Sequence, residues 1–111
     1  MEERIPVEVD IAWESFHEVI NMSSEELGAW LRSGAQDEFP AGPGLTLPEL
    51  GQQVIELLRK RKVDLTQRDA DVMEQVVDFV LTQEAEGPAE SATDEQWRSA
   101  LMTVGHDPMR S

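Results

Sequence analysis

Several residue types are absent or scarce in this 111-residue chain, and each absence excludes a class of structure. There is no cysteine, which excludes disulfide bonds and thiolate zinc sites and is compatible with the reducing cytoplasm. Tyrosine is also absent and phenylalanine occurs three times, so the bulky anchors are Trp13, Trp30 and Trp97. No apolar run has the length of a membrane span, and the acidic N-terminal residues do not resemble a signal peptide. We therefore predict a cytoplasmic protein with no membrane contact.

Basic residues are the other scarce class. Nine Lys and Arg stand against 23 Asp and Glu, which gives a net charge of −14 and opposes nonspecific attraction to phosphate or anionic lipid. The distribution is uneven: residues 1–58 carry −10, residues 59–68 carry +4, and residues 69–111 carry −8. Residues 59–68 are therefore a single positive segment in an acidic chain.

Four segments carry the same signal for the start of a helix. Each has an apolar residue, a hydroxyl residue, an acid or amide three positions later, and then a second apolar residue. The hydroxyl residues are Ser23, Thr46, Thr66 and Thr93. A further helix is predicted over about residues 7–21, where apolar residues recur on one stripe. The sequence thus predicts an all-α fold, a compact bundle of about five helices.

The longest helical signal spans residues 45–83 and predicts a central antiparallel helical hairpin, because the connection between its two helices is only a few residues long. The apolar residues expected to be buried in its second helix are Ala70, Met73, Val76, Val77, Val80 and Leu81. Segments 35–44 and 84–92, which contain Pro and Gly, are predicted loops. We expect a flexible N-terminus over residues 1–6, a single helical domain over residues 7–108 and a tail over residues 109–111.

The basic residues Arg59, Lys60, Arg61, Lys62 and Arg68 are the first candidate binding site. They could hold phosphate, nucleic acid or an acidic peptide. A simpler interpretation is that cations at the end of a helix complement its dipole. No aromatic residue interleaves with these bases to stack on a nucleotide. We favour the simpler interpretation.

The second candidate is the stretch Gly105-His106-Asp107-Pro108. Gly105 suits the left-handed position after a helix, and Pro108 blocks helix continuation, which together predict a docked C-terminal turn. His106 and Asp107 also suggest acid/base chemistry, but no nucleophile or substrate pocket accompanies them.

His17, with Glu14 and Glu18 at helical spacing, could form a metal site, although such surface groupings are common.

Three groups of residues occur in an order that is similar to one known family. They are Asn21-Met22 with Glu26-Leu27 and Trp30-Leu31; Gly51 with Ile55–Lys60, Asp64-Leu65-Thr66, Asp69, Met73 and Val76-Val77; and Trp97-Arg98-Ser99 with Leu101-Met102 and Gly105–Pro108. Over about residues 14–109 the chain resembles the domain of unknown function 3140 family of small bacterial proteins, common in actinobacteria. The family has no established activity, and a DNA-binding label on some members implies a nucleic-acid partner.

The chain departs from the family where a nucleic-acid partner would need support. Members tend to have an Arg-His pair and further bases after the fourth helix, where this chain has Thr-Gln-Glu-Ala-Glu-Gly-Pro at residues 82–88. Members also tend to have Asn-Trp where this chain has Thr103-Val104. These departures and the net charge therefore disfavour a nucleic-acid partner for this chain, compared with the family at large.

Together these features predict a non-enzymatic protein-interaction or regulatory module with a protein partner. Nucleophile elbows, phosphate-binding Gly loops and Cys/His zinc spacings are absent, so no catalytic residue, metal site or cofactor is predicted. Two alternatives are a DNA-associated protein that uses residues 59–68, and an acidic DNA mimic that occupies a basic partner. A third is an enzyme that uses His17 or His106.

Overall fold

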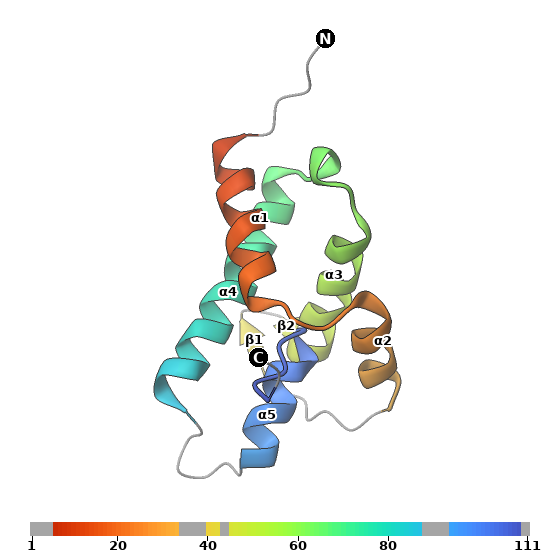
Figure 1. The fold of residues 1–111 in the computed structure, drawn as a ribbon, viewed down its shortest axis with the longest axis vertical. Coiled ribbons are helices and arrows are strands. Elements are labelled where there is room, and N and C mark those ends of the chain that lie inside the picture. Colours follow the sequence, from red (N-terminus) through yellow and green to blue (C-terminus); the bar gives the residue numbers. More distant parts are fainter. Residues whose placement is uncertain (1–5, 34–39, 43–44, 88–93, 110–111) are drawn as a thin grey trace.

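The computed structural model describes residues 6–33, 40–42, 45–87 and 94–109. These residues form five α-helices, which confirms the predicted all-α bundle (Figure 1). The elements in chain order are α1 (Val7–Val19), α2 (Ser24–Ser33), β1 (Pro40–Gly42), β2 (Leu45–Thr46), α3 (Leu47–Arg59), the 3₁₀ turn η1 (Lys62–Asp64), α4 (Gln67–Glu86) and α5 (Asp94–Thr103). Most of the predicted flexible N-terminus, residues 1–5, and residues 110–111 of the predicted tail lie outside the described residues.

The predicted loop over residues 35–44 needs a small correction. Its described part, β1, pairs with β2 as a short antiparallel ladder with an irregular register. The second predicted loop, residues 84–92, begins too early, because α4 continues to Glu86 and ends at Gly87, which has a φ of +69°. Both corrections extend hydrogen-bonded backbone into segments that composition alone assigns to loops.

The helix starts follow the predicted capping chemistry. Three of the four predicted caps lie among the described residues, and each forms both bonds of a capping box. The pairs are Ser23 with Glu26, Thr46 with Glu49, and Thr66 with Asp69. Thr93, the fourth predicted cap, lies outside the described residues.

The helices pack chiefly in two pairs, α1 with α4 and α2 with α3 (Figure 1). The helices α3 and α4 run in opposite directions, as the predicted hairpin requires, but direct packing between them is limited. The connection is longer than a tight turn because Lys60, Arg61 and Leu65 have extended backbones on either side of η1. The hairpin is therefore splayed, and each of its helices packs on a different partner.

One hydrophobic cluster joins all five helices, and its largest fully buried side chains include Phe16, Leu27, Leu50, Met73 and Leu101. The three tryptophans are partly buried and pack against the edge of this cluster. Leu81, which the sequence pattern predicts to be buried, is 52% exposed. No described helix is both long enough and apolar enough to cross a membrane.

The helices α3 and α5 approach each other at a glycine. A Cβ atom added to Gly51 would lie 2.2 Å from the carbonyl oxygen of Thr103, which is far inside van der Waals contact. The missing side chain therefore lets the end of α5 dock directly on α3. This contact places the C-terminal turn that follows α5 within reach of the corner between α1 and α2.

Candidate functional site

The basic turn, which we define as Arg59–Lys62, lies where α3 ends. Lys60 leaves the helix with an extended backbone, and its N–H donates to the carbonyl of Leu57 at 3.2 Å. The positive side chains thus surround the C-terminal end of α3, where they complement the partial negative charge of the helix dipole. This placement supports the interpretation of the basic turn as a helix end.

Three of the four bases pair with acids of the same chain. The pairs are Lys60 with Asp69 (2.7 Å, Nζ to Oδ2), Arg61 with Asp64 (2.8 Å, Nε to Oδ2), and Lys62 with Asp10. Each pair satisfies a charge that an incoming phosphate would otherwise neutralise. A nucleic-acid ligand at the basic turn would therefore have to compete with carboxylates already in place.

Lys62 also connects α1 to the segment between α3 and α4 through two contacts. Its Nζ lies 4.5 Å from the ring centroid of Trp13, within the range of a cation–π interaction. The same ammonium group pairs with Asp10, one turn before Trp13. Lys62 therefore has a structural role that the sequence does not reveal, since its partners are about fifty positions away.

The basic turn also changes the pKa values of its carboxylate partners. The hydrogen bond from Arg61 lowers the pKa of Asp64, and the same bond raises the pKa of Arg61. Partial burial acts to raise the pKa of Asp69, but the hydrogen bonds from Lys60 and Thr66 outweigh it and the pKa is lowered. Both carboxyl groups are thus stabilised in the ionised form that the pairs require.

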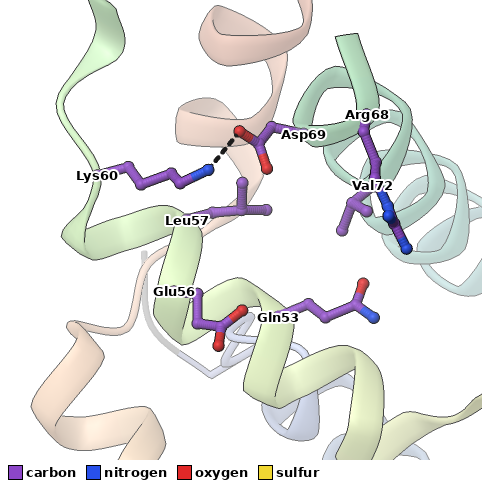
Figure 2. Close-up of a pocket in the computed structure, with 7 residues that line it drawn as sticks. All are labelled: Gln53, Glu56, Leu57, Lys60, Arg68, Asp69 and Val72. Carbon is purple, nitrogen blue, oxygen red and sulfur yellow. Dashed lines mark hydrogen bonds and ion pairs between the residues drawn. The ribbon is translucent and has the colours of Figure 1, made fainter. Parts of the chain in front are cut away.

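Arg59 and Arg68 complete the predicted basic set, and both are exposed. Neither forms an ion pair with another described residue. Arg68 lies in the first turn of α4 and lines a cavity of about 210 Å³ between α3 and α4 (Figure 2). The lining residues are Gln53, Glu56, Leu57, Lys60, Arg68, Asp69 and Val72. The cavity lies between the two helices of the splayed hairpin.

The C-terminal turn, Gly105–Pro108, is docked as predicted, and the structure places it on the corner between α1 and α2. Gly105 has a φ of +96°, and its carbonyl accepts from the backbone N–H groups of Asn21 and Met22 at 3.1 and 3.2 Å. Its own N–H donates to Met102, and the N–H of His106 donates to Leu101. The turn therefore closes the end of α5 and hydrogen-bonds two backbone groups that lie after α1.

His106 is buried, and its ring faces two other helices. Nδ1 lies 2.6 Å from the carbonyl oxygen of Val19, the last residue of α1, so the nitrogen must carry the proton and donate. Nε2 lies 3.4 Å from Oε2 of Glu84 on α4 and makes no hydrogen bond within the described residues. Asp107 does not contact this ring in a dyad, because its carboxylate binds Arg98 and the N–H of Met109. The structure therefore does not bring His106 and Asp107 together as an acid/base pair.

His17 is exposed on α1, with Nδ1 2.9 Å from the carbonyl oxygen of Trp13 and its ring centroid 4.2 Å from that of Trp13. No group of three or more His, Asp or Glu side chains in the described part of the chain is arranged to hold a metal ion. The metal hypothesis for His17, Glu14 and Glu18 therefore gains no support from the geometry.

Several contacts of structural or site residues carry no signal in the sequence. Trp30 donates from Nε1 to the buried hydroxyl of Thr103 at 3.1 Å, and that hydroxyl donates to the carbonyl of Ser99 at 2.7 Å. Gln53 and Glu56 line the cavity beside Arg68, yet they look like ordinary polar residues on the outer face of a helix. Their roles depend on which helices meet, and a local pattern does not specify that.

Comparison with known proteins places the chain in a family. A model of the family described as "Protein of unknown function (DUF3140)" matches residues 15–102, which is most of the chain. No curated protein and no solved structure matches significantly. The chain therefore belongs to the family of proteins of unknown function DUF3140.

Proposed function

We propose that this protein is a non-enzymatic interaction module of the cytoplasm that binds a basic protein partner. The main support is the way its scarce bases are used. Lys60, Arg61 and Lys62 pair with acids of the chain itself, and Arg98 pairs with Asp107 at 3.3 Å. With most of the described bases neutralised, the charge presented outward is negative, in line with the net charge of −14.

The outer face of α4 is the surface best suited to such a partner. Asp71, Glu74 and Asp78 are exposed and lie at spacings of three and four, so they share one face of the helix. They line a shallow hollow of about 470 Å³ together with Gln75, Phe79, Thr82 and Gln83. An acidic rim around a partly exposed aromatic ring can attract Lys and Arg side chains and pack against their aliphatic stems.

The geometry of the two histidines supports a role without catalysis. His106 is turned toward Val19 and Glu84, and His17 binds the carbonyl of its own helix. Among the described residues, neither ring forms a hydrogen bond with a hydroxyl group that it could activate. The basic turn likewise supports this proposal over a DNA-associated role, because three of its charges are already paired.

The test is affinity capture from the host lysate with the intact protein and two charge-matched variants. The first variant carries D71N, E74Q and D78N on α4, and the second carries E8Q, E14Q and E18Q on α1. We expect the wild type and the α1 variant to retain the same basic protein, and the α4 variant to lose it. Equal loss with both variants, or no protein retained by the wild type, would overturn the proposal.

A mobility-shift titration with DNA at low salt tests the nucleic-acid alternative directly, since phosphate binding is strongest there and fades as salt rises. We expect no shift. A shift that disappears in the variant R59Q, K60Q, R61Q, K62Q would replace the proposed function with DNA association.

A further inference from the structure

The cavity between α3 and α4 carries a charge arrangement that is independent of the proposed protein interface. Four charged residues line it: Glu56, Lys60, Arg68 and Asp69. Lys60 and Asp69 pair with each other at 2.7 Å, so their charges cancel within the wall. Arg68 and Glu56 are the remaining charges, and neither forms an ion pair with a described residue. The cavity thus presents one positive and one negative group.

The two groups come from opposite walls. Figure 2 shows Glu56 and Gln53 reaching from α3 toward the space between the helices, while Arg68 extends into that space from α4. Gln53 and Glu56 are three positions apart and therefore neighbours on one face of α3. The side-chain oxygen of Gln53 is buried and accepts no hydrogen bond from the described residues. The α3 wall therefore offers acceptors, one charged and one neutral, and the α4 wall offers the donors of a guanidinium.

We propose that this cavity binds a free α-amino acid with an aliphatic side chain. The ammonium group of the ligand would donate to Glu56 and Gln53, and its carboxylate would accept the two parallel hydrogen bonds that a guanidinium such as that of Arg68 provides. Leu57 and Val72 supply the apolar part of the lining, against which an aliphatic side chain packs. The ligand is recognised as a zwitterion, because each of its charges meets one of the two unpaired charges of the cavity.

The size of the cavity agrees with a ligand of this class. Its volume of about 210 Å³ is below the roughly 300–1,000 Å³ of pockets that enclose drug-sized molecules. A nucleotide would also place phosphate charge beside Glu56 and Asp69, which disfavours it. A single amino acid satisfies both the volume and the charge balance.

The test is a titration of the ¹⁵N-labelled full chain followed by NMR, with leucine and two blocked derivatives as probes. N-acetylleucine lacks the ammonium charge and leucinamide lacks the carboxylate. We expect leucine to shift the backbone signals of Gln53, Glu56, Arg68 and Val72 in a saturable way at millimolar concentration, and each blocked derivative to bind at least about tenfold more weakly. No saturable shift with leucine, or equal binding of leucine and either derivative, would overturn the proposal.

Substitutions at three exposed positions complete the test. We expect R68Q and E56Q each to weaken leucine binding at least about tenfold, because each leaves one ligand charge without its partner. R59Q removes the same charge as R68Q from an exposed arginine that does not line the cavity, and we expect it to bind leucine as the wild type does. Equal weakening by R59Q and R68Q would show a nonspecific charge effect and would contradict the assigned site. Capture of a basic partner through α4 does not require Arg68 or Glu56, so the two proposals fail separately.

Discussion

Asn21 and Asp107 hold each other by a reciprocal pair of hydrogen bonds. The side-chain Nδ2 of Asn21 donates to the carbonyl of Asp107 at 2.9 Å, and the backbone N–H of Asp107 donates to Oδ1 of Asn21 at 2.7 Å. A single amide side chain thus adds two bonds to those that Gly105 accepts from the corner between α1 and α2. The side-chain amide of Asn21 thus bonds both the N–H and the carbonyl of Asp107, as a backbone amide of a neighbouring strand would.

The first prediction concerns this contact. Replacing Asn21 with Ala removes both bonds to the partly buried backbone of Asp107, so we expect the free energy of unfolding to fall by about 2–3 kcal/mol. Urea denaturation followed by circular dichroism measures it. The control is Q52A, which removes an exposed amide side chain from α3 and should change stability by less than about 0.5 kcal/mol. Equal stability of N21A and Q52A would contradict the role assigned to Asn21.

The second prediction compares two helical glycines. In G51A the new methyl group would overlap the carbonyl oxygen of Thr103, so α3 and α5 must separate and we expect a loss of about 3 kcal/mol or more. In G28A the nearest atom is the mobile end of Arg32 at 3.2 Å, and alanine favours the helix by up to about 1 kcal/mol. Thermal unfolding of both variants measures the difference in their melting temperatures. If G51A melts with or above G28A, the close approach of α3 and α5 is not required.

The third prediction is a pH dependence that arises at Asp69. The folded-state pKa of this carboxyl is lowered, so its contribution to stability is present above the unfolded pKa of about 3.9 and is lost as the pH falls through the folded value. We expect D69N to be less stable than the wild type at pH 7, and the difference to shrink from about pH 5 downward. Urea denaturation at several pH values measures this difference.

The control for Asp69 is D78N, which removes an exposed carboxylate from the same helix without breaking a capping box or an ion pair that includes Lys60. We expect the stability of D78N to follow the wild-type pH curve. A constant difference between D69N and the wild type across the whole range would contradict the lowered pKa assigned to Asp69.

The fourth prediction concerns the buried ring of His106. H106A removes the donor to the carbonyl of Val19 and opens a space beside α1, so we expect a loss of about 2–4 kcal/mol. Asparagine can place an N–H₂ group near the position of Nδ1, and H106N should therefore recover part of the loss. Chemical denaturation of both variants provides the comparison. If H106N is no more stable than H106A, the bond to Val19 contributes little and ring packing dominates.

Local features of this fold could be predicted from the sequence, because they depend on residues a few positions apart. The capping boxes at Ser23, Thr46 and Thr66 form as expected, and Gly105 adopts the left-handed conformation that ends α5. The sequence also predicts a docked C-terminal turn, since Gly105 and Pro108 prevent the helix from continuing.

The pairing of the helices could not be predicted in the same way. Apolar periodicity identifies which face of α4 is buried, but it does not show that α1 rather than α3 covers that face. For the same reason the basic residues at 59–68 suggest a binding site, but the sequence does not show that Asp10 and Asp69 neutralise two of them. Leu81 is 52% exposed although its residue type predicts burial, while its neighbour Val80 is fully buried, so the two lie on different faces of α4.

The contact between Asn21 and Asp107 also has a consequence for the order of folding. The two residues are 86 positions apart, so joining them closes a loop that contains most of the chain and carries a large entropic cost. The starts of α2, α3 and α4, in contrast, are each fixed by a capping box that spans three positions. We therefore expect the helices to form first and the C-terminal turn to dock last. Until it docks, the two backbone N–H groups at the corner between α1 and α2 do not have the acceptor that the turn provides.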